Sequence, residues 1–269
     1  MSAEHNRSLR TLCVGIDPHP RVLEAWGCAN SDAGLASFVS RIVPGLVDSG
    51  VRVVKPQVAF FERLGVAGMR QLAVLIGELR ALGIVVIGDA KRGDIGSTMS
   101  GYADAWLAPG SDFEVDFLTA VPYQGVGALE PALRLAADHD KGVFVLAATS
   151  NPEAGDTQKA RRADGMSVAH GVVDDMSKWV LNNPGTQSRF GVVVGATVSL
   201  TDFGFDMSDY PGMPILAPGF GYQGAELSQA STLFPDTSPL FAVVARSVLL
   251  AGEAGFTDAV RSAEGDLHS

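Results

Sequence analysis

Residues 84–89 read IVVIGD, a run of four β-branched apolar residues followed by a glycine and a carboxylate. A short continuous apolar run of this kind is typical of a parallel strand that is covered on both faces. The segments on either side, residues 62–82 and 98–107, have the apolar spacing of helices that bury one face. The stretch therefore predicts a helix–strand–helix unit of an α/β fold.

The same pattern recurs along the chain. Seven further apolar runs are found at residues 12–16, 51–54, 115–118, 143–147, 192–194, 215–217 and 240–244. Further helix candidates are residues 35–48, 126–138, 167–181 and 247–262. Eight strand–helix units in 269 residues predict a (β/α)8 TIM barrel. The alternative is a doubly wound open sheet, which has fewer strands and a glycine-rich fingerprint after the first strand. Here the first run is followed instead by Asp17, Pro18, His19 and Pro20.

The chain shows no shift in composition and no linker that would divide it. We therefore expect residues 1–269 to form a single barrel that is the catalytic domain. The one long polar connection, residues 151–164, follows the fifth strand and is a candidate lid.

Bulk composition excludes several classes of function. The chain has 20 Lys and Arg against 30 Asp and Glu, a net charge of −10, which argues against a nucleic-acid-binding surface but not against an anionic substrate. Two cysteines are too few for a disulfide framework or a zinc site, and no metal site is expected. Because neither a signal peptide nor an apolar run long enough to cross a membrane is evident, we expect a cytoplasmic protein with no membrane partner.

Charged residues stand where the first three strands end. Asp17 stands at the end of the first apolar run, Lys55 at the end of the second, and Asp89 at the end of the third. Lys91 follows Asp89 by two residues, so both side chains would point the same way in extended backbone. Since strand ends meet at the catalytic face of a barrel, we expect a cluster of charges that shift one another's pKa values and favour the ionised forms.

The segment after this cluster carries Asp94, Ile95 and Thr98 at the entrance to the third helix. Asp94 would add a second carboxylate near Lys91. The alternative is that Asp94 simply caps the helix and that Lys91 is a solvated surface lysine.

A second cluster follows strands seven and eight. It comprises the glycine-rich residues 218–224, including Pro218 and Gln223, together with Arg246. Glycines let backbone N–H groups approach an anion, and an arginine can donate two parallel hydrogen bonds to phosphate oxygens. The segment predicts a phosphate site, in which Gln223 bridges phosphate and base or caps the next helix. The alternative is an ordinary Gly-Pro turn beside a surface arginine.

Several stretches together resemble the orotidine 5'-monophosphate decarboxylase family, in its branch of longer bacterial enzymes. The matching segments are residues 55–62, 89–98, 149–152, 218–224 and 245–247. The most specific is the pattern D-x-K-x-x-D-I-G-x-T at residues 89–98. Position 245 departs from the family, with Ala where many members have Gly before the arginine. The resemblance implies conversion of orotidine 5'-monophosphate (OMP) to UMP in de novo pyrimidine biosynthesis, with no cofactor and no metal.

The resemblance also implies a role for each matching residue. Lys91 would donate a proton to C6, in an array with Lys55, Asp89 and Asp94. The substrate-binding positions would be Asp17 on the ribose, Ser150 on the pyrimidine edge, and Pro218, Gln223 and Arg246 around the phosphate. Members of the family are homodimers in which the segment carrying Asp94, Ile95 and Thr98 reaches into the neighbouring site, and we expect shared active sites here.

Two other functions are compatible with parts of this pattern. Sugar-phosphate enzymes of the same barrel group share D-x-K-x-x-D but use Mg²⁺ to stabilise an enediolate. Lys55 argues against them, because it places a fixed cation where a metal enzyme would need carboxylate ligands. A non-catalytic barrel that binds a phosphorylated ligand is the other alternative, and it leaves the charges at three strand ends unexplained.

Overall fold

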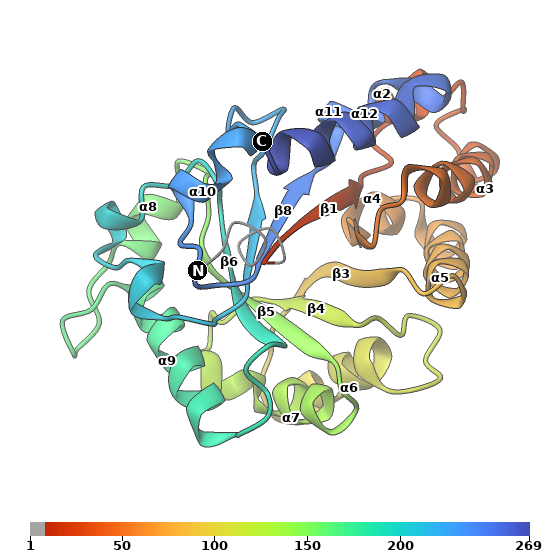
Figure 1. Ribbon diagram of the computed structural model, residues 1–269. Coiled ribbons are helices and arrows are strands. Elements are labelled where there is room, and N and C mark those ends of the chain that lie inside the picture. The colour runs from red at the N-terminus through yellow and green to blue at the C-terminus, as the bar shows by residue number, and fades with distance from the viewer. Residues whose placement is uncertain (1–8) are drawn as a thin grey trace.

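The computed structural model describes residues 9–269 of the chain (Figure 1). Eight parallel strands pair in sequence order and close into a barrel, with helices around the outside. The predicted (β/α)8 barrel is therefore confirmed. The strands are β1 (Arg10–Ile16), β2 (Val53–Pro56), β3 (Val85–Arg92), β4 (Phe117–Ala120), β5 (Gly142–Ala148), β6 (Phe190–Val194), β7 (Ile215–Pro218) and β8 (Leu240–Val244).

The helical layer is less regular than the strands. The α-helices are α2 (Pro20–Ala25), α3 (Asp32–Ser49), α4 (Val58–Glu62), α5 (Gly65–Ala81), α6 (Gly96–Leu107), α7 (Glu130–Asp138), α8 (Ala154–Gln158), α9 (Val168–Asn182), α10 (Ala230–Leu233), α11 (Arg246–Leu249) and α12 (Gly252–Leu267). Short 3-10 segments are η1 (Val126–Leu129), η2 (Leu200–Phe203), η3 (Met207–Asp209) and η4 (Leu227–Gln229). Between β6 and β7, η2 and η3 stand where a regular barrel has a helix.

Two helices expected to be continuous are each divided in two. The predicted helix at residues 62–82 begins inside α4 and continues as α5 after a break, and Gly65 has a φ of 62°. The predicted helix at residues 247–262 is α11 followed by α12, and Gly252 has a φ of 69°. Left-handed backbone, which glycine adopts without steric cost, ends one helix and reorients the next.

The strands are apolar throughout because both of their faces are buried. One face packs against the helices, and the other fills the barrel. The interior set has one residue from each strand: Cys13, Val53, Ile87, Phe117, Phe144, Val193, Leu216 and Val243. These side chains close the interior below the strand ends, so open space remains above them.

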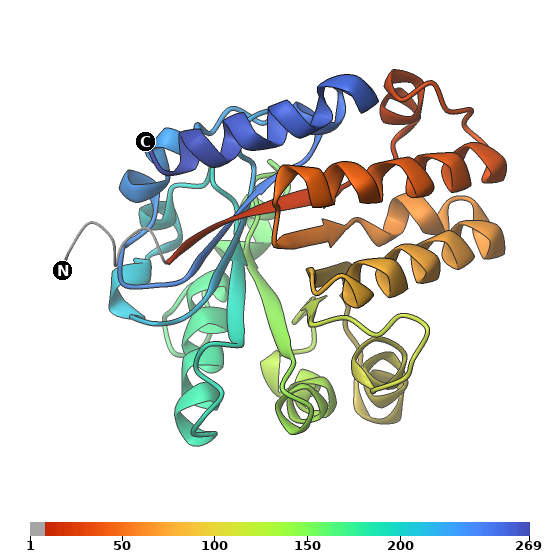
Figure 2. The ribbon, with the colours of Figure 1, turned by 45° about the vertical axis from the view of Figure 1, so that its right-hand side comes forward.

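The barrel closes where the first and last strands meet. β1 pairs with β8 from Arg10 opposite Leu240 to Val14 opposite Val244. Outside this seam, α12 lies alongside α3 (Figure 2). The indole of Trp26 packs edge-on against the rings of Phe38 and Phe256, at centroid distances of 5.0 and 5.4 Å. These aromatic contacts tie the helices beside α2 together over the seam.

Within residues 9–269, no helix combines the length and the apolar character that crossing a membrane requires. The expectation that the chain lacks a signal peptide concerns the N-terminus, and residues 1–8 lie outside the described part of the chain.

Candidate active site

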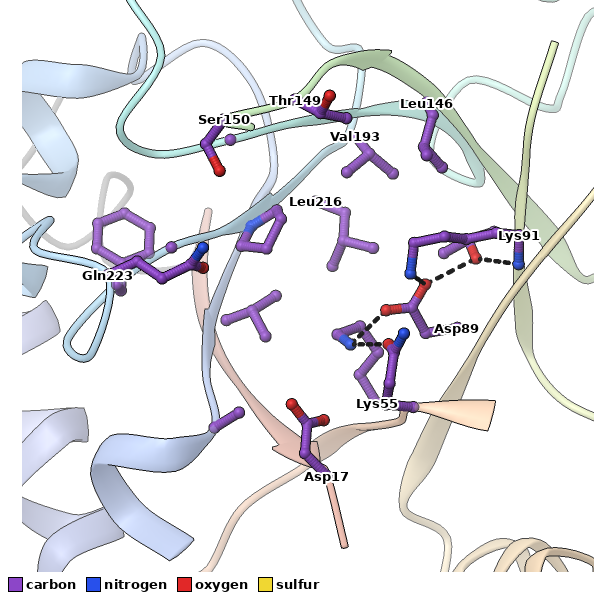
Figure 3. A pocket seen from close by; sticks show the side chains of 18 of the residues that line it. Asp17, Lys55, Asp89, Lys91, Leu146, Thr149, Ser150, Val193, Leu216 and Gln223 are labelled. Atoms are coloured by element: carbon purple, nitrogen blue, oxygen red, sulfur yellow. Dashed lines mark hydrogen bonds and ion pairs between the residues drawn. The ribbon is translucent and has the colours of Figure 1, made fainter. Parts of the chain in front are cut away.

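A pocket of about 340 Å³ opens at the carboxyl ends of the strands (Figure 3). It gathers most of the residues that the sequence singled out: Asp17, Lys55, Asp89, Lys91, Ser150, Pro218, Gln223 and Arg246. Its apolar wall was not predicted and is formed by Leu146, Val193, Leu216 and Val243. Val193, Leu216 and Val243 belong to the interior set of the barrel and Leu146 packs against it, so these residues are both the top of the core and part of the pocket lining.

Asp89 is the centre of the charge cluster. Its Oδ2 lies 2.6 Å from Nζ of Lys55, and its Oδ1 lies 2.6 Å from Nζ of Lys91 (Figure 3). Burial alone would raise the pKa of Asp89, but the two ammonium groups outweigh burial and hold that pKa at about 2. Burial would likewise lower the pKa of Lys55, yet Asp89 and Asp17 raise it above its ordinary value. Asp89 and Lys55 are therefore held in their charged forms at neutral pH, as predicted.

The backbone at Lys91 is not extended, and this part of the sequence prediction is wrong. Lys91 has a φ of 49°, in the left-handed region that favours glycine. Its N–H donates to Oγ1 of Thr119 at 3.0 Å, and its side chain still reaches Asp89. Thr119 was missed by sequence reasoning, although it directly follows the fourth apolar run, as Asp17 and Lys55 follow theirs. A rule that accepted uncharged polar residues after an apolar run would have selected Thr119 too.

Asp17 points into the pocket from the end of β1 (Figure 3). Among the described residues, no group donates a hydrogen bond to its buried Oδ1. Burial raises the pKa of Asp17 in spite of the nearby cations of Lys55, Arg246 and Lys91. A buried acceptor without a donor is costly unless a ligand supplies one, and this makes Asp17 a candidate binding group of the pocket.

The opposite end of the pocket has the features of an anion site. Gly219, Gly221 and Gly224 have φ values of 120°, 73° and 105°, so the loop turns sharply and brings its backbone to the pocket. Gln223 extends from this loop into the pocket (Figure 3). The alternative in which it caps a helix is wrong, because the next helical segment, η4, has Glu226 at its N-cap.

Arg246 stands at the first position of α11 and faces the same end of the pocket. Its guanidinium lies over the ring of Tyr222, with Cζ 3.9 Å from the ring centroid. The preceding Ala245 fits because Gly15 lies opposite on β1: a Cβ atom on Gly15 would be only 2.7 Å from Cβ of Ala245. Ala245, which stands where many family members have Gly, therefore fits because the facing residue on β1 is a glycine.

Three predicted site residues lie outside the pocket. Asp94 accepts a hydrogen bond from the N–H of Ile95 at 2.8 Å, and its carboxylate is not the ion-pair partner of Lys91. Ile95 is 61% exposed, and Thr98 is exposed in the first turn of α6. The N-cap residue of α6 is Ile95, so the alternative in which Asp94 is the cap residue is wrong as well.

The connection after β5 is partly ordered by its own contacts. Within residues 151–164 the chain forms α8, where Gln158 accepts from the N–H of Thr149 and donates to its Oγ1, both at 2.9 Å. Ser150, the residue after Thr149, lines the pocket. Over residues 9–269, no group of three or more His, Cys, Asp or Glu side chains is placed to hold a metal ion.

Known proteins are similar to this chain in sequence and in architecture. The model of the orotidine 5'-phosphate decarboxylase / HUMPS family matches residues 10–255. The orotidine 5'-phosphate decarboxylase of Salinispora tropica is 48% identical over 244 residues, which is 90% of this chain and 85% of the relative. That of Corynebacterium glutamicum is 46% identical over 246 residues, or 90% and 86% of the two chains. A crystal structure assigned to the Streptomyces avermitilis enzyme of the same name superposes with a TM-score of 0.86 at 39% identity, covering 98% and 92% of the two chains.

Proposed function

Because the chain belongs to the orotidine 5'-phosphate decarboxylase / HUMPS family, we propose that Lys91 protonates C6 of OMP once CO2 has left, with no metal or cofactor taking part. The reaction itself, decarboxylation of OMP to UMP in pyrimidine biosynthesis, is that of its relatives and of this chain. The relatives' names favour this nucleotide reaction over the Mg²⁺-dependent sugar-phosphate reactions.

The observation that carries the proposal is the pair of ammonium groups held on one buried carboxylate. Loss of CO2 breaks the C6–carboxylate bond and leaves the electron pair on C6, in an orbital with no neighbouring carbonyl to accept it. A fixed ammonium group beside C6 stabilises that charge, and it can then supply the proton. Lys91 fits this role because Asp89 holds its Nζ in place while Lys55 balances the charge of Asp89. The neutral amine of Lys91 regains its proton from solvent after UMP forms.

The rest of the pocket binds the unreactive parts of the nucleotide. A ribose hydroxyl would donate to Oδ1 of Asp17, which has no donor among the described residues, and Ser150 would contact the pyrimidine edge. Pro218, Gln223 and Arg246 would surround the phosphate. Binding energy from this phosphate can support closure of residues 151–164 and 218–223 over the substrate, so the phosphate raises the rate as well as the affinity.

A second copy of the chain completes each site in this proposal. Asp94, Ile95 and Thr98 lie outside the pocket of their own chain, and two of them are exposed. In a homodimer these residues reach the neighbouring pocket, where the carboxylate of Asp94 would approach Lys91 of the other copy. In this proposal each chain forms a single catalytic domain. The proposed place of action is the cytoplasm.

The metal-free mechanism is tested by following OMP loss in the ultraviolet, with and without excess EDTA. We expect the rate of UMP formation to be the same in both. A rate that falls to background in EDTA and returns with Mg²⁺ would overturn the metal-free mechanism, while UMP as product would still identify the reaction.

A further inference from the structure

Lys91 has a backbone conformation that needs support. Among residues 9–269, only Lys91 and Asp140 are non-glycine residues with positive φ, at 49° and 55°. Asp140 lies in the turn before β5, at the end of the barrel away from the pocket. Lys91 lies inside the pocket, where strained backbone persists only if its surroundings hold it.

The strain arises from a bulge at the end of β3. Gly88 pairs with Leu118 and Arg92 pairs with Ala120, so three residues of β3 stand opposite the single residue Thr119 of β4. Such an irregularity takes the intervening N–H groups out of the strand ladder. Without another acceptor, the N–H of Lys91 would lose its partner.

The hydroxyl of Thr119 supplies that acceptor. Its Oγ1 accepts from the N–H of Lys91 at 3.0 Å and donates to Oδ1 of Asp89 at 3.0 Å. Because a hydroxyl has one proton, the carboxylate at 3.0 Å outcompetes the carbonyl of Gly88 at 3.5 Å. The side chain is 1% exposed, so water does not replace these contacts.

We propose that Thr119 is a positioning residue for the decarboxylation, because one hydroxyl fixes both ends of Lys91. It holds the backbone of Lys91 directly and the ammonium group through Asp89 (Figure 3 shows the Asp89 contact of Lys91). The inference rests on the proposed role of Lys91 as proton donor. In this role Thr119 acts through Lys91 and Asp89 and does not contact the reacting atoms.

The test replaces the hydroxyl while keeping the shape of the side chain. In Thr119→Val, kcat is expected to fall by about tenfold or more, while the Kd for UMP changes by less than about threefold. Thr119→Ser, which keeps a hydroxyl, should recover kcat to within about threefold of the wild type. A matched control is Thr186→Val, which removes a hydroxyl bonded to the carbonyl of Asn183 far from the pocket and should leave kcat and KM unchanged.

The pH profile separates positioning from a general effect on folding. Thr119 donates to the ionised form of Asp89, so loss of the hydroxyl should move the acid limb of kcat to higher pH in Thr119→Val and not in Thr119→Ser. Circular dichroism and Tm establish that each variant is folded. Should Thr119→Val fail to fold, Thr119→Ala removes the same hydroxyl with a smaller side chain and is held to the same expectations.

The proposal and the mechanism on which it rests fail in different ways. A folded variant without the hydroxyl whose kcat stays within about threefold of the wild type would overturn the role of Thr119. So would a serine variant as slow as the valine variant. Substantial turnover in Lys91→Ala would instead overturn the proton-donor role of Lys91, whatever the Thr119 variants do.

Discussion

Asp17 illustrates how a binding group can lower the stability of the protein that carries it. Within residues 9–269, nothing donates to one oxygen of its buried carboxylate, and burial raises the pKa of Asp17. An acid whose pKa is raised on folding binds more protons in the folded state than in the unfolded state. Its unfavourable contribution is therefore absent below the ordinary pKa of about 4 and grows as pH rises toward the folded pKa.

We predict that Asp17→Asn raises the free energy of unfolding at neutral pH, and that this gain disappears as pH falls toward about 4. The same variant should bind UMP more weakly, because the amide oxygen of Asn is a weaker acceptor for a ribose hydroxyl than a carboxylate. Urea unfolding across this pH range measures the first effect and calorimetry the second. Asp258→Asn is the control, since Asp258 is exposed on α12, and it should alter neither quantity. A variant that is less stable than the wild type at neutral pH would contradict the argument.

Lys91 should be required for chemistry and not for folding. Lys91→Ala leaves Asp89 paired with Lys55, so the buried carboxylate keeps a cation and the barrel should fold. We expect kcat to fall by about 10²-fold or more, with UMP affinity largely retained. Single-turnover kinetics and a UMP titration check the two parts. Lys178→Ala, which removes an exposed lysine paired with Asp174 on α9, should behave as the wild type.

At the scale of elements, the fit between β1 and β8 controls the position of Arg246. A Cβ atom on Gly15 would lie 2.7 Å from Cβ of Ala245, the residue before Arg246. We predict that Gly15→Ala destabilises the protein by about 1–3 kcal/mol and weakens the binding of UMP more than that of uridine. Adding Ala245→Gly should restore both properties, and chemical denaturation with nucleotide titrations gives the full double-mutant cycle. Independent, additive effects of the two substitutions would show that the strands do not interact in this way.

The elements also show which features the sequence could predict. Eight apolar runs lie within or beside the eight strands, because parallel strands buried on both faces need continuous apolar residues. The strand-end rule located Asp17, Lys55 and Asp89 for the same reason, since topology brings all strand ends to one face. The breaks in the helices depend on glycines in left-handed conformation, and a glycine in sequence does not reveal its φ.

The remaining features of the site come from contacts between elements. The conformation of Lys91 follows from the mismatch between β3 and β4, and only the paired register shows it. The placement of Asp94 outside the pocket likewise depends on how the chain turns between Arg92 and α6. Thr119 was within reach of the strand-end rule but carries no charge, so it did not stand out among apolar neighbours.

At the scale of the whole molecule, shared sites predict complementation between two inactive variants. In the proposed dimer, Lys91→Ala removes the proton donor of its own pocket, and Asp94→Ala removes the carboxylate that would serve the neighbouring pocket. A dimer with one chain of each kind has one site with both residues intact. Mixing the variants in equal amounts, with exchange of subunits, should restore about a quarter of the wild-type activity.

The control for this experiment is a mixture of Lys91→Ala with Lys55→Ala chains. Both residues belong to the pocket of their own chain, so every site in that mixture remains defective. Recovery of activity in this control, or none in the first mixture, would contradict sites shared through Asp94. The mass of the particle in solution, measured by light scattering, shows whether dimers are present in both.

The seam between β1 and β8 also has a consequence for how the protein is made. Arg10 and Leu240, which pair across it, leave the ribosome on the order of ten seconds or more apart at ordinary rates of synthesis. Until β8 emerges, the nascent chain has two open sheet edges that can pair with other chains. It also lacks Arg246, which lines the pocket at the start of α11. If Arg246 binds the phosphate as proposed, only finished chains bind substrate, and substrate then favours the last step of their folding.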